Sequence, residues 1–240
     1  MKWLVQADSP VSEAQLPQVD IRECVGVVGP IGDFRGQLLG AEAQGIGNWA
    51  MKRQREYSTG RHFAHLAMQA LGETPVSIMR REDRSPAWPA HLFGSIAHSD
   101  DVAIAVLAQS RTCGGIGVDV ERRGRIGADL FDTLFTRHEQ DAIRGGRSAT
   151  ELFCAKEALY KTVYPLVRKF INFTDVTFVA DTADADAARY IGNDPEAGKA
   201  ISMTVFSKRL TTTHACVVAW LPLCVGGSEL NLPVSNQRRS

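Results

Sequence analysis

The stretch Ile116-Gly117-Val118-Asp119-Val120-Glu121 carries two carboxylates, one residue apart, in an otherwise apolar run. The run predicts a β-strand, and because side chains alternate across a strand, Asp119 and Glu121 share one face. This spacing suits a hard divalent cation such as Mg2+, which takes oxygen ligands. The alternative is an exposed strand face followed by the basic run Arg122-Arg123-Gly124-Arg125, but neighbouring carboxylates repel each other unless a cation lies between them.

A third carboxylate lies downstream, on a helix that we predict over 149–164 and that Pro165 is expected to close. Wound at about 100° per residue, this helix separates an apolar arc from an adjoining polar arc. The apolar arc consists of Leu152, Ala155, Leu159 and Val163, and the polar arc of Phe153, Lys156, Glu157, Tyr160 and Lys161. The simpler interpretation is an exposed face with a Glu157–Lys161 pair. Because the preceding strand already supplies two carboxylates, we favour convergence of Glu157 with them.

Size and composition limit the class of protein. The 240 residues are 44% hydrophobic, which is enough for one large domain or two small halves. The 27 basic and 27 acidic residues balance, so no global field draws the chain to nucleic acid or to a membrane. The five cysteines form no Cys-x-x-Cys pair, which favours reduced thiols. Without a signal peptide or a spanning apolar stretch, we expect a cytoplasmic protein with no membrane insertion.

The order of the remaining elements indicates the fold class. Helical periodicity runs over 48–71, and capping-box signatures at Thr136 and Ser148 open two more helices. We expect strands over 76–80, 92–98, 102–108, 116–121, 173–180, 201–207 and 214–221. These strands come in blocks, so the pattern favours α+β with antiparallel pairing over a doubly wound parallel sheet. The segment before residue 48 gives no clear assignment.

A pair of glycines divides the chain. Gly114-Gly115 is the expected boundary between an N-terminal half over 1–114 and a C-terminal half over 115–225. Each half reads loosely as a helix followed by strands, so the two halves could be related in fold. Residues 226–240 read as a polar, disordered tail.

A basic cluster and one histidine are the candidates for binding an anion. Lys52, Arg53, Arg55 and Arg61 lie in one helical stretch, and Arg53 and Arg61 are eight residues apart, which puts them on one face. Guanidinium groups bind phosphate oxygens in a bidentate fork. A solvated basic face is the commoner meaning of such a run. Gly60 lowers helix stability, so a close approach of a ligand or of backbone is expected there.

Four motifs, in their order along the chain, resemble those of the 4′-phosphopantetheinyl transferases of the larger, pseudo-dimeric class. Within that class the chain most resembles the siderophore-synthase branch. They are Lys52-Arg53-Gln54 with Gly60-Arg61, Trp88-Pro89 with Gly94-Ser95-Ile96-Ala97-His98, Gly117-Val118-Asp119-Val120-Glu121, and the segment Phe153–Lys161. Any one motif is weak, whereas the last two together at this separation are specific. Ala97 stands where the family usually has Ser or Thr, and Phe153 replaces the usual Trp.

The resemblance implies a fold and a reaction. The fold is two similar α+β halves in one chain, a pseudo-dimeric monomer with the active site in the cleft between them. The reaction moves the phosphopantetheine arm of coenzyme A to a serine of an apo acyl, peptidyl or aryl carrier protein, releasing adenosine 3′,5′-bisphosphate. Such carriers serve siderophore, nonribosomal peptide, polyketide and fatty-acid synthesis, and the sequence does not distinguish them.

The resemblance also assigns roles. Asp119, Glu121 and Glu157 are expected to hold Mg2+, and Glu157 to accept the serine proton directly or through a water. Lys161 and Lys156 are expected to assist catalysis and to contact phosphate oxygens. The other coenzyme A contacts implied are Arg53, Arg61 and His98, at the 3′-phosphate, and Ser95.

Two other classes of function stay open at this point. The carboxylates alone would also suit a Mg2+-dependent phosphodiesterase or nucleotide hydrolase. A non-catalytic module that binds coenzyme A or a carrier is the third possibility, and the intact Asp119, Glu121, Glu157 and Lys161 disfavour it. The ordered set of motifs favours transfer over hydrolysis.

Overall fold

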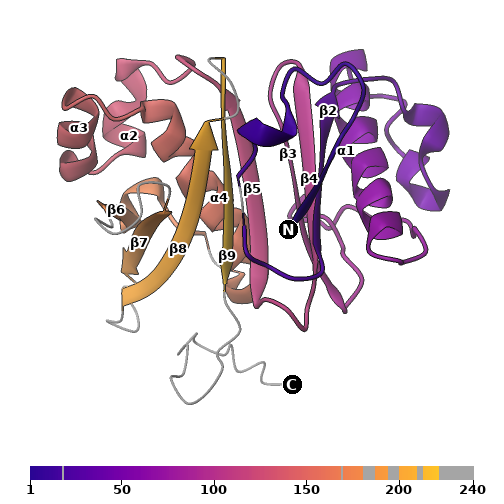
Figure 1. Cartoon of the computed structure of the whole chain (residues 1–240). Helices are drawn as coiled ribbons and strands as arrows, with labels where there is room; N and C mark the ends of the chain where they lie inside the picture. Colours follow the sequence, from indigo (N-terminus) through magenta and orange to yellow (C-terminus); the bar gives the residue numbers. More distant parts are fainter. Residues whose placement is uncertain (18, 169, 181–186, 194–199, 210–212, 222–240) are drawn as a thin grey trace, which may run out of the picture.

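The computed structural model describes residues 1–17, 19–168, 170–180, 187–193, 200–209 and 213–221. They form two β-sheets packed against each other, with one long helix on the outer side of each (Figure 1). The layers are therefore helix, sheet, sheet and helix. Every helix in the described part of the chain is too short or too polar to cross a membrane.

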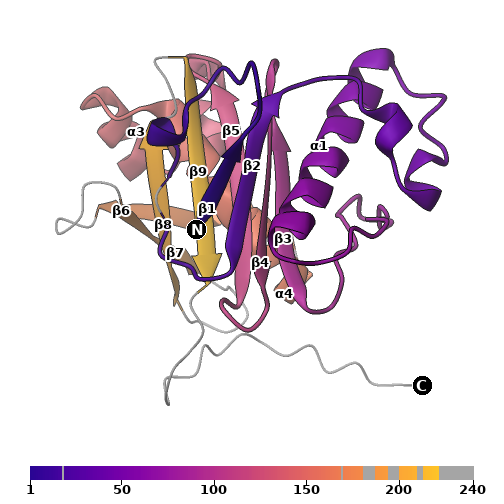
Figure 2. The ribbon, with the colours of Figure 1, turned by 45° about the vertical axis from the view of Figure 1, so that its right-hand side comes forward.

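The N-terminal half holds a four-stranded sheet and helix α1. The strands follow the order β1-β2-β4-β3, in which β1 and β2 are parallel and the other pairs antiparallel. The elements are β1 (Lys2–Val5), β2 (Cys24–Pro30), α1 (Met51–Ala70), β3 (Leu92–His98) and β4 (Val102–Gln109), with short 3-10 helices at Glu13–Gln15, Arg35–Gln37 and Gly40–Ala43. Helix α1 covers the outer face of this sheet (Figure 2). It packs there through Phe63, Ala64, Ala67 and Met68.

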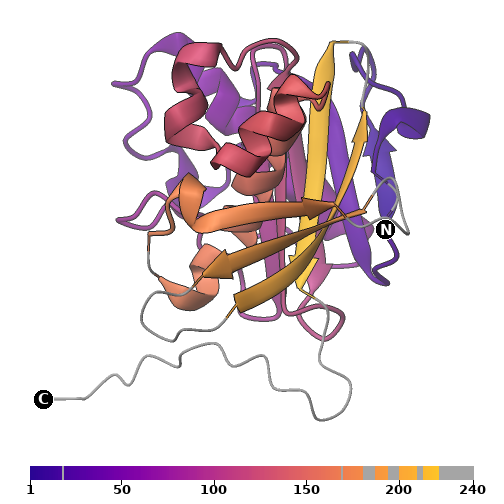
Figure 3. The same cartoon turned by 90° about the vertical axis from the view of Figure 1, so that its left-hand side faces the viewer.

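The C-terminal half holds a five-stranded antiparallel sheet in the order β5-β9-β8-β7-β6. Its strands are β5 (Gly115–Arg122), β6 (Val176–Ala180), β7 (Ala187–Asn193), β8 (Ala200–Arg209) and β9 (His214–Leu221). Its helices are α2 (Phe131–Leu134), α3 (Arg137–Arg144) and α4 (Ala149–Val167), with 3-10 helices at Ala128–Leu130 and Phe173–Asp175. Figure 3 shows these helices beside the curved strands β6, β7 and β8.

Glycine at position 117 sets how close α4 lies to β5. A Cβ atom on Gly117 would lie 2.5 Å from Thr162 Oγ1 and closer still to the Ala158 carbonyl oxygen. Only a residue without a side chain leaves room for the helix backbone there. Gly60 has a similar reason: the close approach expected from the sequence comes from the side chain of Ile96, which would lie 2.7 Å from an added Cβ.

The two sheets bury a common core. Val106 of β4, Val118 of β5 and Val218 of β9 belong to one apolar cluster between them. The N-terminal segment joins the cluster through Trp3 and Leu16. The strands that carry the candidate site are therefore held on a dry, close-packed layer.

Most predicted elements are confirmed, including the α+β class, the predominantly antiparallel pairing and both capped helices. Thr136 caps α3 with a full capping box, and the Ser148 side chain caps α4. The apolar arc of α4 is buried as predicted. Cys154 is buried too, and the four cysteines among the described residues form no disulfide.

Four details differ from the prediction. Residues 76–80 form no strand, because the backbone of Ile78 bonds to side chains instead: its N–H donates to Glu42 (2.6 Å) and its carbonyl accepts from Arg61 Nε (2.9 Å). Helix α4 continues past Pro165 to Val167 and ends at Arg168, whose backbone is left-handed (φ 52°), so the proline does not close it. Strands β1, β2 and β7 were not assigned from the sequence. Phe173–Asp175, expected to begin a strand, form a 3-10 helix, and the strand β6 begins only at Val176. The expected tail at 226–240 lies outside the described residues.

Candidate active site

The two carboxylates on β5 lie where the sheets meet. Asp119 is only 6% exposed, and its Oδ1 accepts a hydrogen bond from Lys161 Nζ at 2.7 Å. Its Oδ2 is buried and has no hydrogen-bond partner in the described part of the chain. A buried carboxylate oxygen without a donor is costly unless a ligand supplies a positive charge.

Glu121 lies in the same electrostatic environment, two residues further along β5. Its Oε2 accepts from Ser99 Oγ at 3.3 Å and lies 3.8 Å from Arg125 Nε. Burial and the neighbouring charge of Asp119 raise the pKa of Glu121 above its ordinary value. The strand therefore holds two carboxylates that repel each other, as expected from their spacing.

Glu157 and Lys161 reach this site from α4. Burial, followed by the charge of Asp119, raises the pKa of Glu157, while Lys161 acts in the opposite direction. Burial works to lower the pKa of Lys161, but the charges of Asp119 and Glu157 outweigh it, and that pKa is raised. The sheet and the helix thus bring Asp119, Glu121, Glu157 and Lys161 within electrostatic range of one another.

The donor set fits a hard cation in its chemistry but is not arranged as a metal site. Across the described residues, no three His, Cys, Asp or Glu side chains are grouped closely enough to hold an ion. Lys161 holds one oxygen of Asp119 in this conformation. The unpartnered Asp119 Oδ2 is the oxygen of this set that is available to a cation, while burial raises the pKa values of Glu121 and Glu157.

His98 joins the basic cluster of α1 to the carboxylates. Arg53 Nη1 lies 2.8 Å from His98 Nε2 and 3.2 Å from Glu56 Oε2. Burial lowers the pKa of His98; of the charges around it, Glu56 and Asp119 raise it, while Arg53 and Lys161 lower it. Because groups from both halves act on this ring, Arg53 and His98 lie at the same junction as the carboxylates.

Arg61 has a more enclosed environment than the sequence suggested. Its side chain is 6% exposed, its Nε donates to the Ile78 carbonyl (2.9 Å), and its guanidinium lies 4.5 Å from the centre of the Tyr57 ring. Burial lowers the pKa of Arg61. The residue therefore supports the segment around Ile78 in addition to any contact with a ligand.

Ser95 and Lys156 also have protein partners. Ser95 lies on β3, where its hydroxyl accepts from the Val118 N–H at 3.1 Å and so couples the two sheets. Lys156 is 3% exposed and its ammonium has three acceptors within the C-terminal half. The ammonium of Lys156 therefore does not reach the junction between the halves, and it stands apart from the other site residues named from the sequence.

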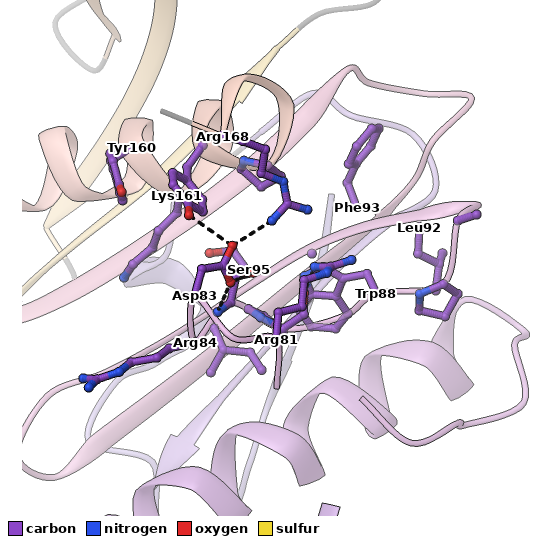
Figure 4. Close-up of a pocket in the computed structure, with 18 residues that line it drawn as sticks. Arg81, Asp83, Arg84, Trp88, Leu92, Phe93, Ser95, Tyr160, Lys161 and Arg168 are labelled. Atoms are coloured by element: carbon purple, nitrogen blue, oxygen red, sulfur yellow. Dashed lines mark hydrogen bonds and ion pairs between the residues drawn. The ribbon is translucent and has the colours of Figure 1, made fainter. Parts of the chain in front are cut away.

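A pocket of about 500 Å3 opens between the halves, and Lys161, which donates to Asp119, lies in its lining (Figure 4). Its N-terminal wall includes Trp88, Phe93 and Ser95, and its C-terminal wall comes from Tyr160 and Lys161 of α4. Three arginines, Arg81, Arg84 and Arg168, add positive charge to its lining. Aromatic walls with several cations suit an anionic ligand with a planar ring.

Asp83 joins the two walls of this pocket. Its carboxylate accepts from Tyr164 Oη at 3.0 Å and from Arg168 Nη1 at 2.8 Å, both at the end of α4. Bonds to Ser85, Tyr164 and Arg168 lower the pKa of Asp83 to about 2. The Arg81–Arg84 turn and the end of α4 were not predicted as pocket walls, because no spacing in the sequence relates the two segments.

Comparison with known proteins assigns the class. A family model for the 4′-phosphopantetheinyl transferase N-terminal domain matches residues 41–108, and one for the 4′-phosphopantetheinyl transferase superfamily matches residues 115–218. The first match ends at residue 108 and the second begins at residue 115. The fold, with its two α+β halves, is that of this class.

Individual proteins similar to this chain support the same class. The chain is 33% identical to the 4′-phosphopantetheinyl transferase Npt of Nocardia iowensis, over 61% of this chain and 69% of that protein. It is 32% identical to the 4′-phosphopantetheinyl transferase PptT of Mycobacterium tuberculosis, over 60% of this chain and 66% of that protein. Enterobactin synthase component D of Escherichia coli O157:H7 is 34% identical over 46% of this chain and 54% of that protein. The chain belongs to the 4′-phosphopantetheinyl transferase family, whose enzymes transfer phosphopantetheine from coenzyme A to carrier proteins.

Proposed function

We propose that this chain transfers the 4′-phosphopantetheine arm of coenzyme A to the serine hydroxyl of an apo carrier protein in a Mg2+-dependent reaction that releases adenosine 3′,5′-bisphosphate. The observation that carries the proposal is the meeting of Asp119, Glu121, Glu157 and Lys161 beside a cationic, aromatic pocket between the halves. The family supports transfer, and the site chemistry supports the metal and the leaving group.

Asp119, Glu121 and Glu157 would hold the cation. The unpartnered Oδ2 of Asp119 is the first oxygen available to the cation. Lys161 would release Asp119 Oδ1 when the cation binds. A bound Mg2+ would neutralise charge that develops on the pyrophosphate oxygens. Mn2+ offers the same ligand preference, so a comparison of the two ions belongs in the test.

Glu157 and Lys161 would carry the proton and the charge. The serine oxygen forms a bond to the β-phosphorus of coenzyme A, and the bond from that phosphorus to the bridging oxygen breaks. The serine proton passes, directly or through a water, to Glu157, which acts as the general base. Lys161 stabilises the phosphate oxygen that leaves as part of adenosine 3′,5′-bisphosphate.

The nucleotide portion of coenzyme A would bind at the junction of the halves. Arg53 and His98 are exposed enough to reach its 3′-phosphate. The buried Arg61, on the same helix as Arg53, would add positive charge. The pocket beside Lys161, with Ser95 on its wall, would take the adenine ring and the neighbouring phosphates. In this arrangement the N-terminal half, over 1–114, would bind the coenzyme A phosphates. The C-terminal half, over 115–225, would supply the catalytic groups.

One assay separates transfer from the alternative, hydrolysis. The protein is mixed with coenzyme A and each of a panel of apo carrier domains from siderophore, peptide, polyketide and fatty-acid synthases, with Mg2+, Mn2+ or EDTA. Transfer predicts that at least one carrier gains one phosphopantetheine by mass spectrometry, with equal release of adenosine 3′,5′-bisphosphate and loss of both in EDTA. Cleavage of coenzyme A without a carrier would indicate a phosphodiesterase, and transfer in EDTA would remove the metal from the proposal.

Variants locate the activity. Glu121→Gln is expected to lower the rate strongly, whereas the exposed Glu13→Gln, on a surface 3-10 helix, is expected to leave it unchanged. The same preparation, run on a sizing column with light scattering, is expected to be monomeric because one chain supplies both halves. A dimer that is required for activity would contradict a site formed within one chain.

A further inference from the structure

Lys156 is adjacent to the candidate base in sequence, yet it turns away from the pocket. Its side chain is 2% exposed, and its partner Glu139 is fully buried. Nζ lies 2.6 Å from Glu139 Oε2, 3.0 Å from the Leu134 carbonyl oxygen and 2.6 Å from the Phe173 carbonyl oxygen. An ammonium has three N–H donors, so these three acceptors use all of them.

The three acceptors belong to three separate segments. The Leu134 carbonyl ends α2, Glu139 lies in the first turn of α3, and Phe173 begins the 3-10 helix that follows α4. Glu139 also caps α3, because its Oε2 accepts the Thr136 N–H (2.8 Å) in the capping box of that helix. One ammonium therefore fixes α2, α3 and the Phe173 segment to α4.

The Phe173 segment faces Glu157. A small cavity of about 60 Å3 is lined by Glu157 and Tyr160 on α4 and by Phe170–Phe173 on the opposite side. The bond from Lys156 to the Phe173 carbonyl fixes the distance between these two sides. The Phe173 ring also stacks with that of Phe153, 5.6 Å between centres, one turn before Glu157 on α4.

We infer that Lys156 is a positioning residue: its buried ammonium holds α2, α3 and the Phe173 segment on α4 and so fixes the surroundings of Glu157. The inference rests on the proposed function for the role of Glu157. It replaces the phosphate contact expected from the sequence, because a lysine whose three donors are used inside the protein has none left for a phosphate of coenzyme A.

A change at Glu139 distinguishes a positioning role of Lys156 from a phosphate contact. Glu139 lies on α3, is fully buried and carries the wrong charge to bind phosphate. If Lys156 acts by position, Glu139→Gln and Lys156→Met both loosen the same three segments and lower turnover. If Lys156 binds phosphate, only Lys156→Met weakens the binding of the nucleotide.

The experiment compares Lys156→Met, Glu139→Gln, the double variant and the control Arg144→Gln, which removes an exposed charge from the same helix α3. Amide hydrogen exchange is followed in peptides spanning 131–140 and 170–176. Binding of adenosine 3′,5′-bisphosphate and the kcat for carrier modification are measured well below the melting temperature. Thermal unfolding of each variant defines that range.

We expect faster exchange in both peptides for Lys156→Met and Glu139→Gln, a fall in kcat of tenfold or more, and bisphosphate affinity within twofold of the unaltered protein. The double variant is expected to be no slower than Lys156→Met, because both changes break one connection. Arg144→Gln is expected to match the unaltered protein in every measurement.

Three results would overturn the inference. One is a tenfold loss of bisphosphate affinity in Lys156→Met alone, which indicates a phosphate contact. Another is unchanged exchange in the two peptides. The third is normal kcat with only a lower melting temperature, which indicates a role in stability alone. If the unaltered protein modifies no carrier, the proposed function fails, and hydrogen exchange still decides whether Lys156 joins the three segments.

Discussion

Replacing Asp119 with asparagine tests the centre of the site with almost no change of shape. Asparagine keeps the volume of Asp119 and an oxygen that accepts the Lys161 hydrogen bond (2.7 Å). It removes one negative charge from a group that is 6% exposed. Two consequences are expected, one for turnover and one for stability.

The stability change is the balance of two effects. At an effective dielectric of about 20, the attraction between charges 2.7 Å apart is on the order of 6 kcal/mol, but water screens Lys161, whose side chain is 28% exposed. Most of that attraction is offset by desolvation, which leaves a loss of roughly 1–3 kcal/mol. Removing the charge also relieves its repulsion with Glu121 and Glu157. We therefore expect the free energy of unfolding to change by about 1 kcal/mol or less.

Turnover is expected to fall far more. Loss of one charged group that stabilises a transition state typically costs about 4 kcal/mol, or roughly 10^3-fold in rate. The assay is the initial rate of carrier modification by mass spectrometry, with thermal unfolding at neutral pH. Asp141→Asn, an exposed aspartate on α3, is the matched control and is expected to be as active as the unaltered protein. A rate for Asp119→Asn within tenfold of the unaltered protein would show that the charge of Asp119 does not stabilise the transition state.

Three further predictions follow from the packing, the pKa shifts and the basic cluster. Gly117→Ala is expected to push α4 off β5 and to lower the free energy of unfolding by about 1–3 kcal/mol, measured by urea unfolding; an unchanged midpoint would contradict the close approach. The raised pKa of Glu157 means that its contribution to stability is present at acidic pH and is lost as pH rises through the folded-state value. Glu157→Gln should therefore raise the melting temperature at neutral pH and leave it unchanged at acidic pH, and the opposite order would be inconsistent with a buried carboxylate. Arg53→Gln is expected to raise the KM for coenzyme A several-fold with no change in melting temperature, whereas the buried Arg61→Gln should lower the melting temperature; equal effects on both would show that the two arginines act alike.

The parts of the site carried by regular elements could be predicted from the sequence. Alternation in β5 put Asp119 and Glu121 on one face, and helix periodicity put Glu157 and Lys161 together on the polar arc of α4. Both patterns depend only on neighbouring residues in one element. The capping residues Thr136 and Ser148 fixed where the flanking helices begin for the same reason.

The rest depends on contacts between distant segments, which no local pattern carries. Lys156 lies on the polar arc of α4 but is buried, because its partners are a side chain of α3 and two backbone carbonyls, Leu134 and Phe173. The ion pair between Asp83 and Arg168, which joins the two pocket walls, could not be predicted either, because 85 residues of sequence separate the two side chains. Strands β1 and β2 were missed because the first 47 residues hold only short apolar patches with many glycines.

The most direct test of the account is a crystal of this protein grown with Mn2+ and coenzyme A, examined by anomalous scattering at the manganese edge. We expect a single strong peak within ligand distance of carboxylate oxygens of Asp119 and Glu121, with Glu157 facing it and Lys161 released from Asp119. We also expect the nucleotide between the halves, in the pocket beside Tyr160. A well-ordered nucleotide with no anomalous peak at these carboxylates, or a peak bound elsewhere while Lys161 still holds Asp119, would contradict the proposed metal site.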